Sequence, residues 1–291
     1  MDYLIRILDT PEDMAKIEDL YPVVWGGNDL DVTPAHLTLA ISHNGGVVLG
    51  AFDGERLIGF ILGFLGTDHR SPDRPAMARL KHASHELAVD PEYRNQGVGY
   101  ALKIAQRSIV EQQGVRLITW TYDPLLSLNA QLNIRRLGAV CDTYRENEYG
   151  EMRDQLNRGI VSDRFQVDWW ITSNRVKQRL EGARQALDLA HFLSAGAVML
   201  NQVRLGEDGL SRPDLAILEP ESNLAIVEIP ANYLDLRSKD HGLAVFWREH
   251  TRTIFQAAFN AGYLVTDFIY FREERFPRSY YILAHGEGKF G

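Results

Sequence analysis

The spacing of apolar residues along the chain predicts an alternation of strands and helices. Short apolar runs favour strands, whereas apolar residues three or four positions apart favour helices. Asp53-Gly54, between two apolar runs, predicts a hairpin turn. In the first half, strands are expected at 3–8, 47–53, 56–65, 85–89, 115–122 and 139–144, and helices at 11–21, 34–43, 98–109 and 127–137. This order predicts an α/β fold with a mixed sheet.

The alternation continues in the second half, so a second α/β domain is expected there. A chain of 291 residues has room for two domains of ordinary size, which we place at 1–150 and 151–291. The expected elements of the second are a short helix at 152–159, a strand at 162–171, a helix at 173–194, short strands at 197–201, 215–218 and 224–229, a long helix at 242–261, and strands at 263–271 and 280–284.

The stretch 84–109 combines an apolar strand, a polar loop with two glycines and an amphipathic helix. Asp90-Pro91 ends the strand, because proline cannot donate a hydrogen bond to a β-ladder. Gly97 and Gly99 allow a ligand to approach the backbone closely. The first amides of a helix have no acceptor within the helix and lie at the positive end of its dipole. The stretch therefore predicts a binding site for an anionic group such as a phosphate.

The composition is that of an ordinary globular protein, and the net charge limits the classes of partner that are expected. Apolar residues make up 45% of the chain and charged residues 24%. The 31 basic and 39 acidic side chains give a formal net charge of -8, which argues against a nucleic-acid partner. The sequence has no apolar run long enough to span a bilayer and no apolar segment typical of a signal peptide. We therefore expect a cytoplasmic protein without a membrane partner.

The single cysteine, Cys141, excludes an internal disulfide and a cysteine-based zinc site, and no metal is expected. It follows the small apolar run Leu137-Gly138-Ala139-Val140. This context favours a small buried side chain over a reactive thiol.

The loop Arg94-Asn95-Gln96-Gly97-Val98-Gly99 resembles the R/Q-x-x-G-x-G/A loop of the GNAT superfamily of N-acyltransferases. The order of strand, two helices, hairpin and glycine-loop strand also resembles the start of a GNAT domain. The resemblance implies a GNAT fold for 1–150, with acetyl-CoA or another acyl-CoA as co-substrate. In such a domain the loop amides hold the pyrophosphate, and the preceding strand lends backbone groups to the pantetheine arm. The cofactor-binding residues implied are Leu87, Ala88, Val89, Arg94, Asn95, Gln96, Gly97, Val98, Gly99, Tyr100 and Asn129.

The candidate base follows from strand alternation. In a regular strand, His85 shares a face with Leu87 and Val89, and histidine side chains titrate near neutrality. His85 is therefore the leading candidate for removing a proton from the attacking amine. Glu86 would point to the opposite face, but a β-bulge would reverse this, so Glu86 stays a competitor.

The residue that usually acts as the acid is absent, because this chain departs from the family pattern. Ile134 stands where many relatives carry a tyrosine that protonates the departing thiolate. Tyr144 and Tyr149 are the remaining candidates, and protonation by solvent or by the attacking ammonium stays open. Because Cys141 lies in an apolar stretch, we expect direct attack in a ternary complex rather than a covalent acyl-enzyme.

The second half resembles the C-terminal extension of a group of longer GNAT proteins. A strand at 224–229, a long helix and two further strands are similar in order to the centre of the first half. Pro230-Ala231-Asn232 stands where the paired glycines would be, so a second CoA site of the same kind is not expected. A degenerate GNAT-like repeat and an unrelated α/β extension both stay open.

The leading interpretation is an N-acyltransferase that acetylates a small amine or an amino acid. A succinyl donor is an alternative if Arg70, Arg74 or Arg79 of the long loop 66–81 grip a carboxylate. A non-catalytic acyl-CoA sensor is a second class, and the missing tyrosine favours it. A transferase that uses charged tRNA is a third class, disfavoured by the acidic balance. A homodimer is left open.

Overall fold

The computed structural model describes residues 3–26, 32–70, 72–150, 159–183, 187–272, 275–286 and 288. It divides into two compact units. The first unit comprises Met1–Trp120 and Met152–Gly159, and the second unit comprises Thr121–Glu151 and Ile160–Gly291. The α/β fold class is confirmed, whereas the expected domain boundary at residue 150 stays a prediction.

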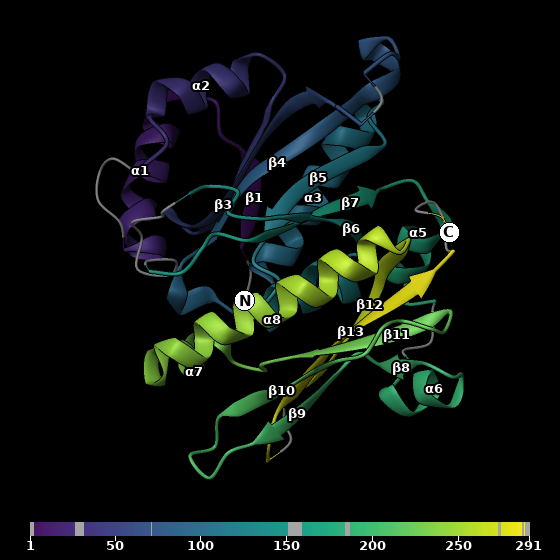
Figure 1. Ribbon diagram of the computed structural model, residues 1–291. Coiled ribbons are helices and arrows are strands. Elements are labelled where there is room, and N and C mark those ends of the chain that lie inside the picture. Colours follow the sequence, from purple (N-terminus) through teal and green to yellow (C-terminus); the bar gives the residue numbers. More distant parts are fainter. Residues whose placement is uncertain are drawn as a thin grey trace. The chain divides into compact units, whose positions relative to one another are not determined.

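The first unit contains a sheet in the order β1-β2-β3-β4-β5 (Figure 1). Neighbouring strands from β1 to β4 are antiparallel, and β5 is parallel to β4. The elements are β1 (Leu4–Ile7), α1 (Pro11–Trp25), α2 (Ala35–His43), β2 (Val47–Asp53), β3 (Arg56–Thr67), η2 (Ala76–Arg79), β4 (Leu80–Val89), η3 (Pro91–Tyr93), α3 (Val98–Gln112) and β5 (Leu117–Tyr122), of which the last two residues belong to the second unit.

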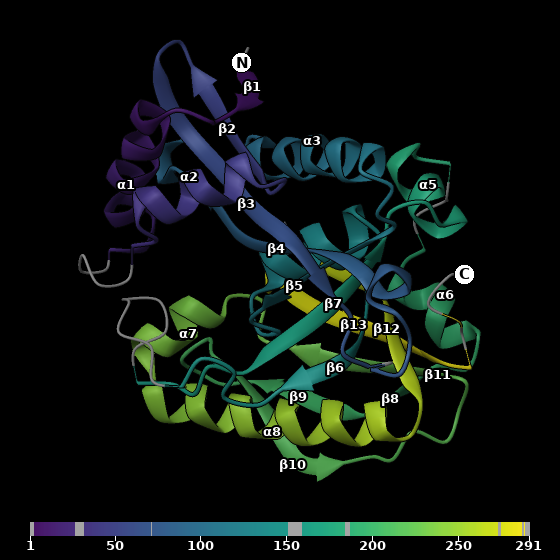
Figure 2. The same cartoon turned by 90° about the horizontal axis from the view of Figure 1, so that it is seen from above.

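The two faces of this sheet are covered by different helices (Figure 2). Phe60 and Leu62 of β3 point into a core with α1 and α2. Side chains added at Gly59 and Gly63 would instead meet residues of α3, because successive strand positions face opposite ways. The buried members of the core on the α1 and α2 face are Leu8, Met14, Ile17, Leu20, Tyr21, Val48, Phe52, Leu57, Phe60, Leu62 and Ala88.

The second unit has a sheet in the order β7-β6-β12-β13-β11-β8, with α8 packed against it (Figure 1). Strands β9 and β10 form a separate two-stranded sheet. The elements are α4 (Ser127–Ala130), η4 (Gln131–Arg136), β6 (Val140–Arg145), β7 (Arg164–Trp170), α5 (Asn174–Leu180), α6 (Leu189–Ser194), β8 (Val198–Met199), β9 (Asn201–Leu205), β10 (Ser211–Ile217), β11 (Leu224–Ile229), α7 (Tyr233–Lys239), α8 (His241–Asn260), β12 (Tyr263–Phe271) and β13 (Arg278–His285).

Three helical predictions differ from the structure. The helix expected at 127–137 is one turn of α-helix, α4, followed by the π-helical segment η4. The helix expected at 173–194 is two helices, since Gly182 adopts a left-handed φ of 66° and Asp188 caps the start of α6. The short helix expected at 152–159 falls almost wholly outside the described residues.

The strand order of the second unit does not repeat the centre of the first. β4 and β5 are parallel neighbours, whereas β13 lies between β11 and β12 and is antiparallel to both. The expected order of strand, long helix and two strands is present, but its strand pairing differs from that of the centre of the first half. A degenerate GNAT-like repeat stays a prediction. None of the described helices is both long enough and apolar enough to cross a bilayer.

Candidate active site

The glycine loop leads from β4 into the first turn of α3. Asp90 accepts a hydrogen bond from the amide of Glu92 at 3.0 Å, which starts a short turn after the strand. Asn95 has a φ of 62° and Gly97 a φ of 87°, both in the left-handed region. Gly97 is the N-cap of α3, so the amides that follow it open the helix. This geometry suits an anion, because the first amides of a helix have no acceptor within the helix and the helix dipole favours negative charge there.

Side chains of the loop hold its shape. The guanidinium of Arg94 donates to the carbonyl oxygens of Val89 and Val24, each at 3.2 Å. The amide of Gln96 donates to the carbonyl oxygen of Glu92 at 2.8 Å. A Cβ added at Gly97 would meet no atom within 4 Å, so the space beside the loop is open. The loop therefore fits a pyrophosphate.

Strands β4 and β5 separate just before this loop. Their parallel pairs are His82 with Ile118 and Ala83 with Thr119. Both strands continue further, but among the described residues they form no further pair with each other. An opening between two strands leaves backbone N–H and C=O groups without a ladder partner, and these groups can bond an extended ligand.

A β-bulge interrupts β4 at His85. Leu62 of β3 pairs with Glu86, but the next residue, Gly63, pairs with Ser84, so His85 is an extra residue. Its ring lies 6.0 Å from that of Phe64, and its Nε2 lies 3.5 Å from Oε1 of Glu86. The regular alternation that would group His85 with Leu87 and Val89 is therefore absent.

Glu86 points to the α1 and α2 face, where hydroxyl groups hold its carboxylate. The hydroxyls of Tyr21 and Thr33 both donate to it, the second at 2.7 Å. Burial and the charge of Glu86 raise the pKa of Tyr21, which therefore stays a donor. His85 is about half exposed, whereas the side chain of Glu86 is 15% exposed. The bulge thus places one accessible imidazole beside one anchored carboxylate.

Polar side chains also gather on the opposite face of β4, under α3. Lys103 donates to Ser84 at 2.8 Å and stands 3.6 Å from the ring centroid of Trp120. Gln106 lies 3.2 Å from Nε2 of His82, and all four polar side chains are buried. The buried residues of α3 are Val98, Leu102, Lys103, Gln106 and Val110, so the buried face of this helix includes two polar side chains.

Comparison with known families agrees with this geometry. Residues 13–131 match the model of the acetyltransferase (GNAT) family. These residues form a GNAT acetyltransferase domain. The resemblance that the glycine loop carries is thereby confirmed. No curated protein matches the chain in sequence.

Solved structures similar to the chain include several acetyltransferases. A chain of the NatC complex bound to Gag peptide and CoA shares 18% identity, with 59% of this chain and 100% of that one covered and a TM-score of 0.45. The ribosomal-protein-S18-alanine N-acetyltransferase of Escherichia coli shares 16%, with 57% and 92% covered and a TM-score of 0.43. A mosquito arylalkylamine N-acetyltransferase like 5b shares 14%, with 57% and 99% covered and a TM-score of 0.42. These scores are too low to support an argument about function.

Four further residues considered for the site belong to the second unit. Asn129 is exposed on α4, and Ile134 is fully buried in η4. The hydroxyl of Tyr144 donates to Asp163 at 2.7 Å, and burial raises its pKa. Tyr149 is half exposed, with its hydroxyl 2.7 Å from that of Thr121. Of the two tyrosines, Tyr149 is the accessible one, and the roles of both stay predictions.

Two arginines of the long loop, Arg70 and Arg79, are engaged within the loop itself. Arg70 forms an ion pair with Asp68 at 2.7 Å, and this pairing lowers the pKa of Asp68 to about 2. Arg79 donates to the carbonyl oxygens of Arg74 and Asp68 at 2.7 and 2.9 Å. The grip on a succinyl carboxylate predicted for these arginines would require at least some of these contacts to break.

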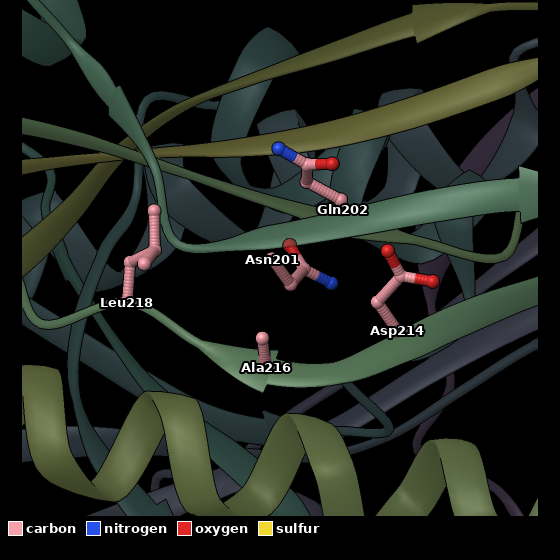
Figure 3. A pocket seen from close by; sticks show the side chains of 5 residues that line it. All are labelled: Asn201, Gln202, Asp214, Ala216 and Leu218. Carbon is pink, nitrogen blue, oxygen red and sulfur yellow. The ribbon is translucent and has the colours of Figure 1, made fainter.

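A small pocket lies in the second unit between β9 and β10 (Figure 3). The strands pair Pro213 with Val203 and then Ile217 with Asn201, and the extra residues of β10 open the space. The side chain of Asn201 is bound to both backbone groups of Glu228 at 2.9 Å, and Asp214 pairs with Arg204 at 3.0 Å. These engaged polar groups give the pocket no evident chemistry.

Protonation of His82 is expected to destabilise the first unit as the pH falls. Burial, with a smaller effect of Lys103, lowers the pKa of His82 to about 4. An unfolded histidine has a pKa of about 6.5, so only the unfolded chain gains this proton between the two values. The contribution of neutral His82 to the free energy of unfolding is fully present above the pKa of the unfolded chain. It declines as the pH falls towards the pKa of the folded protein. In urea unfolding, the free energy of unfolding should fall by about 2 kcal/mol from pH 7 to pH 5 because of this group. This loss should be absent in His82→Gln. Equal losses in both proteins would contradict the prediction.

Proposed function

We propose that the chain is an acyl-CoA-dependent N-acyltransferase, with acetyl-CoA as the default donor and a small amine or amino acid as acceptor. The observation that carries the proposal is one continuous segment of the GNAT domain, in which a separating strand, a bulge and a glycine loop precede α3. The segment offers a cradle for phosphate and backbone groups for an extended arm.

The loop would hold the pyrophosphate through the amides from Gln96 to Tyr100. The fit rests on the left-handed Gly97, beside which the space is open. Leu87, Ala88 and Val89 would lend backbone groups to the pantetheine arm, and an amide of Leu87 or Ala88 would stabilise negative charge on the thioester oxygen. A fixed N–H donor of this kind acts most strongly where charge develops in the transition state.

His85 and Glu86 would act together on the amine. A base works best when a second group orients it, and the Glu86 carboxylate lies 3.5 Å from His85. Tyr21 and Thr33 fix Glu86, so His85 would take the proton while Glu86 positions it. The amine nitrogen forms the bond to the thioester carbon, the carbon–sulfur bond breaks, and the thiol leaves with a proton. Tyr144 and Tyr149 remain candidates for the proton donor.

Ligand-dependent thermal stability tests the proposal. A ligand of the folded state at 100 times its Kd stabilises by about 2.7 kcal/mol. We expect acetyl-CoA or another acyl-CoA, and free CoA, to raise the melting temperature. The absence of a shift with acetyl-CoA, succinyl-CoA and CoA at saturating concentration would reject the proposal.

A non-catalytic acyl-CoA sensor is the second candidate, favoured by the isoleucine at position 134. Both candidates predict thermal stabilisation, so release of free CoA must separate them. The enzyme should release CoA from acetyl-CoA faster when one member of a broad amine panel is added. A sensor should bind the thioester and show no acceleration with any amine.

A further inference from the structure

The first unit contains a buried lysine that the acyl transfer outlined above does not use. Lys103 is 2% exposed. Its ammonium donates to Ser84 Oγ at 2.8 Å and lies over the ring of Trp120, 3.6 Å from the centroid. Among the described residues of the first unit, these are its hydrogen bond and its cation–π contact, and neither partner is an anion. Burial accordingly lowers the pKa of Lys103 well below its ordinary value.

An ammonium in this position is costly to the fold. Removing a charge from water without an opposite charge costs several kcal/mol. Methionine would fill a similar volume without that penalty, and one serine hydroxyl with one aromatic face compensates only part of it. The lowered pKa reduces this cost, because the buried side chain gives up its proton more readily. An anion placed beside the amine would restore the ammonium, so an anionic ligand is the partner that this position favours.

The position of Lys103 in the fold indicates which anion it would bind. The last parallel pair of β4 and β5 is Ala83 with Thr119. The next residues on the two strands are Ser84 and Trp120, and these are the two contacts of the lysine. Lys103 thus stands at the point where the strands separate. If the proposed function is right, the thioester lies along this part of β4, so the acyl group is the nearest part of the donor.

We propose that Lys103 and Ser84 bind a carboxylate at the end of the acyl group, so that the preferred donor is the CoA thioester of a dicarboxylic acid. This inference rests on the proposed function. The ammonium would supply the opposite charge and the serine hydroxyl a second hydrogen bond, as charge-assisted pairs require. An acetyl methyl group would bring no charge to the ammonium. Arg70 and Arg79 of the long loop are less suited, because their guanidinium groups are already engaged with loop atoms.

Binding of matched thioesters tests the inference without knowledge of the acceptor. Succinyl-CoA and butyryl-CoA have acyl chains of four carbons, and only the first has a terminal carboxylate. Their Kd values, with those of acetyl-CoA and free CoA, should be measured by calorimetry on the full chain. We expect wild type to bind succinyl-CoA at least tenfold more tightly than butyryl-CoA. Lys103→Met should abolish this preference and leave the Kd of free CoA unchanged.

Arg107→Met is the matched control. It removes a cation one turn further along α3, where Arg107 is partly exposed and pairs with Glu111 at 3.5 Å. This variant should keep the preference for succinyl-CoA. Equal binding of both thioesters by wild type, or a preference that persists in Lys103→Met, would overturn the inference while acetyl-CoA binding still upholds the proposed function. Failure of wild type to bind any of the four ligands would overturn both.

Discussion

Replacing Gly97 with valine is expected to abolish CoA binding. Gly97 has a φ of 87°, and an L-residue in the left-handed region costs about 1–2 kcal/mol. The added side chain would also enter the open space beside the loop, where the phosphate is expected. Together these effects should raise the Kd for CoA about 100-fold or more, equivalent to roughly 3 kcal/mol. Calorimetry with CoA measures this directly.

Gly114→Val separates the loss of the phosphate cradle from strain alone. Gly114 follows α3, has a φ of 76°, and a Cβ there would also meet no atom within 4 Å. The two variants therefore carry a similar backbone cost at opposite ends of one helix. Gly114→Val should lower thermal stability and keep the Kd for CoA. A comparable loss of CoA binding in both variants would refute a specific role for Gly97.

Replacing His85 with alanine is expected to lower kcat about 100- to 10,000-fold, the usual contribution of a general base. The Kd for CoA should not change, because His85 lies at the bulge and not in the glycine loop. His36→Ala on α2 is the control, since His36 is also exposed. Steady-state kinetics with an accepted amine gives kcat, and calorimetry gives the Kd. Full turnover in His85→Ala would place the base elsewhere.

Glu86→Gln distinguishes a positioning carboxylate from a base. If Glu86 only orients His85, its loss should reduce kcat less than the loss of His85, and the double variant should resemble His85→Ala. Residues that act as one unit give such non-additive effects. A larger loss in Glu86→Gln than in His85→Ala would instead identify Glu86 as the base.

Local patterns in the sequence predicted the backbone geometry of the glycine loop well. Proline after Asp90 and glycine at 97 are constraints on the chain itself, and the structure has the expected turn and left-handed cap. The bulge was harder to foresee. Its signal is the run of three polar residues Ser84-His85-Glu86, which breaks the apolar alternation of the strand. The run shows that alternation fails, and only pairing with β3 shows which residue is extra.

Lys103 could not be predicted as buried, because its surroundings are not local. A lysine on an amphipathic helix normally reaches solvent. Its contacts come from Ser84 and Trp120, which precede and follow α3 in the chain. The π-helical segment η4 was missed for a related reason, since a one-residue widening leaves the apolar spacing nearly unchanged.

The bulge has a consequence for the length of β4. His82 and Ser84 face α3, and beyond the bulge Leu87 lies beside the start of that helix, while Glu86 faces α1. Removing His85 from the chain would join Ser84 directly to Glu86, and every other side chain would keep its face. The strand is therefore one residue longer than its two surfaces require. The additional residue is His85, the candidate base. The packing of the two faces of the sheet therefore does not depend on its imidazole.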